Sequence, residues 1–179
     1  MIPSKVFFTK GMGIHKDKLA SFELALRAAG IEKCNLVKVS SIFPPGCKLI
    51  SKEEGLGLLK PGQITYVVMA KNETNKLNQL ISAAIGLAVP KDNKSHGYLS
   101  EYTSLGETDE KAIAYAEDLA ITMLTMTLGK KSDTEAASEK KNKPNNVNSE
   151  IFKTHICQSA KGNKDGLWTT VAALAVFIV

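Results

Sequence analysis

The sequence has few of the residues that would cross-link the chain or hold a metal. Its 179 residues include three cysteines, Cys34, Cys47 and Cys157, and three histidines. An odd, sparse set of cysteines without paired spacing argues against a disulfide framework and favours a reducing compartment. We therefore expect a cytoplasmic protein. The histidines lie apart from one another and from the cysteines, and this spacing predicts no metal site.

Long hydrophobic runs are also scarce. The apolar run Val6–Phe8 near the N-terminus is too short for the core of a signal peptide. The range 167–179 is almost wholly apolar, but its 13 residues are too few to span a bilayer. We expect a buried strand there and no membrane partner, with a membrane anchor as the less favoured alternative.

The formal net charge is +5, and part of the excess lies in one polar segment. Residues 130–143 hold five lysines against three acidic residues and show no apolar periodicity. This composition predicts a mobile surface insertion over 130–149. An arm that binds nucleic acid is the alternative. Interspersed acids and a lack of aromatic residues argue against it, so we expect no nucleic-acid partner.

The rest of the composition, 44% hydrophobic and 23% charged, fits one soluble α+β domain over residues 1–179. The range 11–13 (Gly-Met-Gly) reads as a flexible turn, and 80–89 suits either a helix or a buried strand. Strands are predicted over 6–9, 35–39, 63–70, 97–103, 150–158 and 167–178, and helices over 18–29 and 108–128. The first helix should bury Leu19, Phe22, Leu26 and Ala29.

One segment carries unusual chemistry. A β-type run from Asn35 leads into Ser40-Ser41 and is stopped by Pro44-Pro45. The hydroxyl of a serine can attack the preceding carbonyl, and elimination from the resulting ester cleaves the chain and leaves a ketone. A hydroxyl needs activation for this step, from backbone strain or from donors to the oxyanion. From these residues alone, a turn that closes a strand is the more ordinary interpretation.

The surrounding residues favour the chemical interpretation. The range 35–45 resembles the self-cleavage segment of the pyruvoyl-dependent arginine decarboxylases, and 81–92 resembles a second stretch of that family. Glu101-Tyr102, about ten residues later, matches the position of the family's catalytic glutamate. Phe22-Glu23 and the range 28–31 resemble its first helix. The resemblance covers about 6–128 and resumes weakly near the C-terminus, with the insertion outside it.

This resemblance implies a fold and an activity. The fold is a single-domain, four-layer αββα sandwich, self-cleaved into a β chain (1–40) and an α chain (41–179). The enzyme converts L-arginine to agmatine and CO2 through a Schiff base on a pyruvoyl group derived from Ser41. It needs neither pyridoxal phosphate nor a metal. The resemblance also implies a trimer or a dimer of trimers with sites between protomers.

The resemblance further implies roles for five residues. Ser41 is the pyruvoyl precursor, and Ser40 becomes the new C-terminus and helps to hold the substrate carboxylate. Asn35 presents its amide to the oxyanion of the cleavage step. Glu101 donates a proton to the carbanion, and burial would keep its carboxyl protonated. Glu23 pairs with the substrate guanidinium.

Glu23 departs from the family pattern, because well-studied members place aspartate there. The extra methylene leaves open the same chemistry on another cationic amino acid, such as ornithine or lysine. An uncleaved, non-catalytic assembly subunit is a further alternative from a different functional class.

Overall fold

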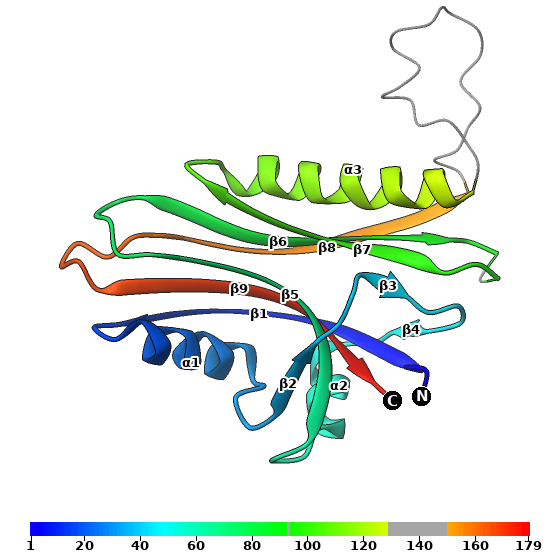
Figure 1. The fold of residues 1–179 in the computed structure, drawn as a ribbon, viewed down its shortest axis with the longest axis horizontal. Helices are drawn as coiled ribbons and strands as arrows, with labels where there is room; N and C mark the ends of the chain where they lie inside the picture. Colours follow the sequence, from blue (N-terminus) through cyan, green and yellow to red (C-terminus); the bar gives the residue numbers. More distant parts are fainter. Residues whose placement is uncertain (93, 129–149) are drawn as a thin grey trace, which may run out of the picture.

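The fold is a four-layer αββα sandwich. The computed structural model describes residues 1–92, 94–128 and 150–179. Two sheets face each other, and Figure 1 shows helix α1 on the outer face of one and helix α3 on the outer face of the other. The layering confirms the fold expected from the resemblance. The predicted insertion over 130–149 lies outside the described residues.

The described helices and strands follow one another without a strict βαβ alternation. In chain order they are β1 (Lys5–His15), α1 (Lys18–Ala29), β2 (Asn35–Lys38), β3 (Ile42–Phe43), β4 (Lys48–Leu49), α2 (Lys52–Leu58), β5 (Ile64–Thr74), β6 (Leu80–Pro90), β7 (Gly97–Leu105), α3 (Asp109–Thr127), β8 (Ile151–Lys161) and β9 (Trp168–Ile178). The five-stranded sheet has the order β2-β5-β9-β1-β4, and the four-stranded sheet has the order β3-β7-β6-β8.

The apolar C-terminal segment forms β9, the central strand of the five-stranded sheet. It pairs antiparallel with both β1 and β5, and residues 171–176 are fully buried. Burial on both faces explains why this strand lacks the alternation of a half-exposed strand. The prediction of a buried strand is confirmed. In the described part of the chain, no helix is long and apolar enough to cross a membrane.

The predicted flexible turn at Gly11–Gly13 is wrong, because β1 runs unbroken through it. The glycines serve close packing instead. A Cβ at Gly11 would lie 2.0 Å from the Ala25 carbonyl oxygen, and one at Gly13 would lie 2.1 Å from that of Ser21. The backbone of α1 therefore rests directly on β1, so the position of this helix is tightly fixed.

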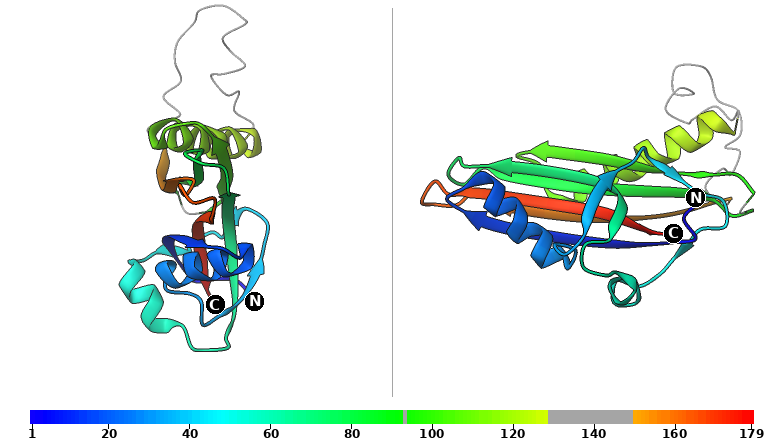
Figure 2. Two further views of the ribbon diagram at one scale, coloured as in Figure 1. Left: turned by 90° about the vertical axis from the view of Figure 1, so that its left-hand side faces the viewer. Right: turned by 60° about the horizontal axis from the view of Figure 1, so that its bottom comes forward.

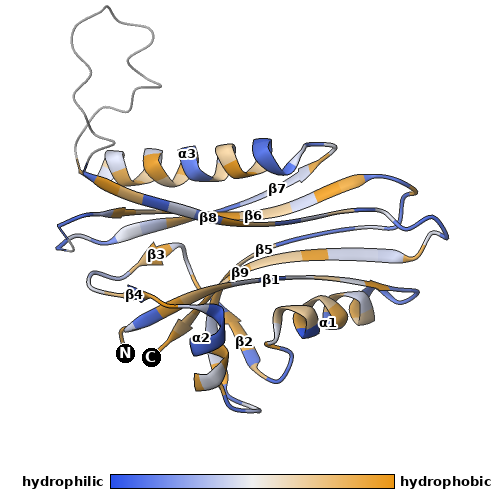
Figure 3. Ribbon diagram, turned by 180° about the vertical axis from the view of Figure 1, so that it is seen from behind, coloured by the Kyte–Doolittle hydropathy of each residue, from blue (hydrophilic) through white to orange (hydrophobic). Residues whose placement is uncertain are grey.

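The ambiguous range 80–89 is a strand, and α3 packs against it in the same way. A Cβ at Gly86 would lie 2.3 Å from the Ala116 carbonyl oxygen. The small residues that suggested a helix are therefore needed for the close approach of α3 to β6. The main core lies between the two sheets and includes Ile85, Leu99 and Val171. Apolar residues run along the strands, whereas α2 begins with hydrophilic residues and ends with an apolar one (Figure 3).

One prediction for α1 is wrong. The buried face of this helix is made by Ser21, Ala25, Leu26 and Ala29. Leu19, which we expected on that face, is 76% exposed. The helix thus shows an apolar side chain to the outside of the protomer.

Candidate active site

The two serines lie where the chain passes from one sheet to the other. Strand β2 ends at Lys38 in the five-stranded sheet, and β3 begins at Ile42 in the four-stranded sheet. Figure 1 and the right-hand view of Figure 2 show this crossing beside the edge of the sandwich. The N–H of Ile42 donates to the Ser40 carbonyl oxygen (2.9 Å), which closes a three-residue turn around Ser41.

Hydrogen bonds hold the carbonyl groups of both serines in place. The Ser40 carbonyl accepts from Ile42, and the Ser41 carbonyl accepts from the N–H of Leu99 on β7 (2.8 Å). A donor already aimed at the Ser40 oxygen is suited to stabilise an oxyanion there. In the described chain Asn78 is the one non-glycine residue with a positive φ, so left-handed strain does not occur at either serine.

Glu101 lies against Ser41. The Ser41 hydroxyl donates to Oε2 of Glu101 at 3.2 Å across 60 positions of sequence. Alternate residues of a strand share a face. Glu101 therefore points to the same side of β7 as Leu99, which packs in the core between the sheets. The Glu101 side chain remains 33% exposed, so one protomer does not bury the carboxyl as we expected.

Lys38 adds a cation to this pair. Its Nζ lies 3.9 Å from Oε1 of Glu101, while its own side chain is 57% exposed. Glu101 thus contacts a hydroxyl through one oxygen and an ammonium through the other. Sequence reasoning missed Lys38. The available signal was its position two residues before Ser40, on the same face of an extended chain.

Asn35 does not contact Ser40 in one protomer. It begins β2, and its Nδ2 donates to the Gly62 carbonyl oxygen at 2.9 Å. Five residues of nearly extended chain, each rising roughly 3.3 Å, separate it from Ser40. The role of Asn35 at the oxyanion stays a prediction.

Glu23 lies apart from the serines. Its carboxylate pairs with Arg27 one helical turn later (3.0 Å), and its side chain is 44% exposed. It borders a depression of about 490 Å³ on α1, whose lining includes neither Ser41 nor Glu101. The lining residues are Asp17, Leu19, Ala20, Phe22, Glu23 and Leu26.

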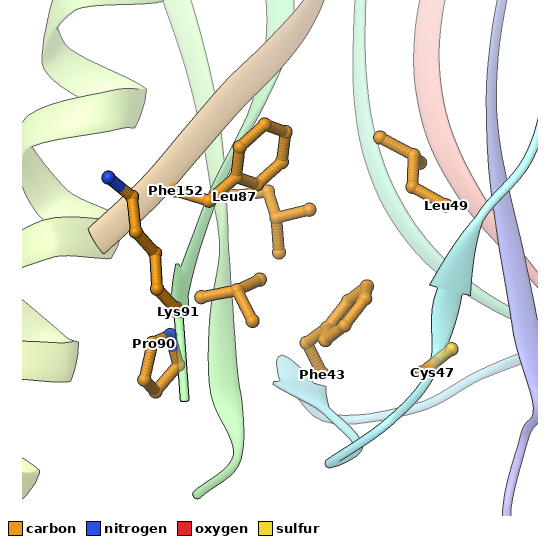
Figure 4. Close-up of a pocket in the computed structure, with 8 residues that line it drawn as sticks. Phe43, Cys47, Leu49, Leu87, Pro90, Lys91 and Phe152 are labelled. Carbon is orange, nitrogen blue, oxygen red and sulfur yellow. The ribbon is translucent and has the colours of Figure 1, made fainter. Parts of the chain in front are cut away.

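Two further cavities lie near the serine turn. One, of about 440 Å³, borders Ser40 and is otherwise lined mainly by apolar residues, including Tyr66 and residues at both chain ends. The other, of about 280 Å³, is lined by Phe43 of β3 and by residues that include Leu87 and Phe152 (Figure 4). Cys47 lines it, and burial raises the pKa of this thiol to about 11, more than its backbone hydrogen bond lowers it. The thiol is therefore poorly suited to act as a nucleophile.

The described residues include no group of three or more histidine, cysteine or acidic side chains able to hold a metal ion. The expectation that the reaction needs no metal stays a prediction. A ketone formed at position 41 fits the site on other grounds. Its neighbours would be a carboxylate, an ammonium and a backbone N–H donor, all of which can interact with a carbonyl group or a bound amino acid.

Comparison with known proteins finds a family and relatives that span the chain. Residues 5–179 match a family model described as pyruvoyl-dependent arginine decarboxylase. The chain is 55% identical to the pyruvoyl-dependent arginine decarboxylase of Methanococcoides burtonii, over 100% of both chains. It is also 55% identical to pyruvoyl-dependent arginine decarboxylase 2 of Methanosarcina mazei, over 99% of this chain and 98% of the relative. A probable pyruvoyl-dependent arginine decarboxylase of Chloroherpeton thalassium is 55% identical over the same shares. The chain belongs to the pyruvoyl-dependent arginine decarboxylase family.

Proposed function

We propose that the chain cleaves itself between Ser40 and Ser41 and then decarboxylates L-arginine to agmatine and CO2. The contact between the Ser41 hydroxyl and Glu101, at a turn that joins two sheets, carries the proposal. Membership of the family supports the reaction and the substrate. The mature protein would consist of residues 1–40 and 41–179 in one folded domain.

Maturation begins with attack of Ser41 Oγ on the carbonyl carbon of Ser40, which moves the acyl group from nitrogen to oxygen. Loss of the Ser41 α-proton then expels the Ser40 carboxylate and leaves an enamine. The enamine takes a proton at its β-carbon to become an imine, and one water hydrolyses this imine, releases ammonia and leaves a ketone at position 41. The Ile42 N–H supports the first step, because it already donates to the oxygen that becomes negative. Asn35 is our second donor, and its amide must leave Gly62 to act.

The pyruvoyl group supplies an electrophilic carbonyl that takes up the electrons left when CO2 departs. The Leu99 N–H holds the adjoining carbonyl of residue 41 in place. Glu101 is our candidate for the proton donor to the carbon that loses CO2, because its carboxyl lies against position 41. The proposal includes neither pyridoxal phosphate nor a metal.

The substrate guanidinium is proposed to pair with Glu23, which offers the two oxygens of a carboxylate. The depression beside Glu23 does not include Ser41 or Glu101, so one protomer does not assemble the whole site. We propose a trimer or a dimer of trimers, in which the depression of one protomer faces Ser41 of the next. The exposure of Leu19 beside Glu23 supports a covered surface there.

We place the enzyme in the cytoplasm, because its three cysteines are free. Release of CO2 from a panel of arginine, ornithine and lysine tests the reaction and its substrate. We expect kcat/KM for arginine to exceed the other two by roughly tenfold or more, since only a guanidinium pairs bidentately with Glu23. Equal release from all three, or a preference for ornithine or lysine, would overturn the substrate assignment.

A further inference from the structure

A cation stands beside the proposed reaction centre without a role in the reaction described so far. Lys38 lies at the end of β2, and its Nζ is 3.9 Å from Oε1 of Glu101. The other oxygen of Glu101 accepts from Ser41. In the described part of the chain, Lys38 is the one cation that forms an ion pair with Glu101.

The substrate brings a further negative charge to this place, in addition to Glu101 and the Ser40 carboxylate that cleavage leaves. Its α-amine must reach the carbon at position 41, and its carboxylate is attached to the carbon next to that amine. The carboxylate therefore lies within a few bonds of Ser41, where Glu101 already provides one carboxyl group. Two carboxylates in one partly enclosed site repel each other unless one is protonated or a cation neutralises them.

We propose that Lys38 binds the α-carboxylate of the substrate and breaks its ion pair with Glu101 when it does so. The inference rests on the function proposed above. A separation of 3.9 Å and a 57% exposed side chain describe a loose pair whose long stem can turn toward a ligand. Once Lys38 has moved to the substrate, it no longer forms its ion pair with Oε1 of Glu101.

This contact has a distinctive kinetic consequence. The carboxylate loses its charge as CO2 departs, so its attraction to Lys38 is weaker in the transition state than in the bound substrate. Such an interaction lowers KM without raising kcat. A residue that only supports the fold would not separate the two constants in this way.

The fold does not depend on Lys38. Strand β2 is held by its parallel pairing with β5 from Asn35 to Lys38 and by the Val39 N–H, which donates to Val67. Lys38→Met removes the charge and keeps most of the apolar stem. Lys111→Met is a matched control, because Lys111 is an exposed residue of α3 on the outer side of the four-stranded sheet.

Calorimetric binding to the mature protein provides the test. One ligand is 5-guanidinopentanoate, which keeps the carboxylate and guanidinium of arginine but lacks the amine. The other is agmatine, which lacks the carboxylate. We expect Lys38→Met to weaken the binding of 5-guanidinopentanoate roughly tenfold or more. The affinity for agmatine should stay the same or increase. Lys111→Met should change neither, and Lys38→Arg should restore most of the difference.

Arginine kinetics and intact mass complete the test. We expect KM to rise by a similar factor in Lys38→Met with kcat unchanged or higher, in a protein that still cleaves. The role of Lys38 would be overturned if both ligands lost affinity equally or if neither lost affinity. A fall in kcat with unchanged KM would overturn it too. A variant that stays in one chain would also overturn it, because the lysine would then act before any substrate binds. A wild-type protein that releases no CO2 from arginine would instead refute the proposed function itself.

Discussion

Replacing Glu101 with glutamine should separate maturation of the protein from turnover. A glutamine carbonyl can still accept the hydrogen bond that Ser41 Oγ donates at 3.2 Å, so the turn around Ser41 is kept and cleavage proceeds. The amide cannot deliver a proton to the carbon that loses CO2. General acid catalysis is typically worth about 10²–10⁴-fold in rate. Since the side chain is 33% exposed, water offers a slower route, and we expect a loss of kcat near 10²-fold.

The assay measures intact mass and CO2 release on the same preparation. Glu107→Gln is a matched control, because it removes a carboxylate from the turn after β7, where Glu107 accepts from Tyr102 (2.8 Å) and does not contact Ser41. We expect the control to cleave and to keep kcat within about twofold. A cleaved Glu101→Gln protein with near-normal kcat would show that Glu101 is not the acid. An uncleaved one would assign Glu101 to maturation.

Three further predictions concern charged side chains. Glu23→Gln should raise KM for arginine by roughly 30-fold and should leave cleavage intact. The factor follows from the low end of about 2–5 kcal/mol for truncating one partner of a charge pair. Glu23→Asp should also raise KM if the pocket is built for glutamate, and an unchanged KM in Glu23→Gln would remove this residue from the site. Arg27→Met should lower that KM about twofold, because a helical i,i+4 pair worth about 0.3–0.5 kcal/mol no longer competes with the substrate; a raised KM would contradict this. Burial raises the pKa of Glu117, but hydrogen bonds from Lys153 and His155 outweigh it and hold the pKa below its usual value. The stabilisation is then present above the unfolded pKa and disappears as pH falls through the folded one. Glu117→Gln should therefore lower the melting temperature at pH 7, and this effect should shrink as the pH falls below the unfolded pKa of about 4.3.

Helix α1 was predictable to the residue because local signals mark both of its ends. Asp17 caps it through a hydrogen bond to the Ala20 N–H, and Gly30 ends it in the left-handed conformation. Helix α3 also starts where Thr108 predicts, although the threonine side chain makes no capping hydrogen bond. The predicted helix ended at residue 128, and Leu128 is the C-cap of α3.

Elements defined by tertiary contacts were not predictable. Strands β3 and β4 have two residues each and exist because β7 and β1 pair with them. Gly11 and Gly13 suggested a turn, since sequence alone does not reveal that a helix backbone approaches them within contact distance. Helix α2 contains Gly55, which weakens any local helical signal, yet Gly55 is buried against the ring of Phe7.

The candidate site was predictable only in part, for a similar reason. The resemblance pointed to both Ser41 and Glu101, and the structure brings them together. The donor to the Ser40 carbonyl is the backbone N–H of Ile42, which no side-chain pattern identifies. Glu23 and Ser41 were expected in one site between protomers, and within one protomer the depression beside Glu23 does not include Ser41. The proposed site needs an assembly to bring the two residues together, and the sequence of one chain does not display an assembly.

Self-cleavage is tested most directly by the intact mass of the purified wild-type protein beside that of Ser41→Ala. We expect two wild-type chains, residues 1–40 and 41–179, with the larger one resistant to Edman sequencing because its first residue has lost its amine. Ser41→Ala should remain a single chain of 179 residues and release no CO2 from arginine. A wild-type protein that is uncleaved yet fully active, or a Ser41→Ala protein that still cleaves, would contradict the claim that Ser41 gives rise to the catalytic group.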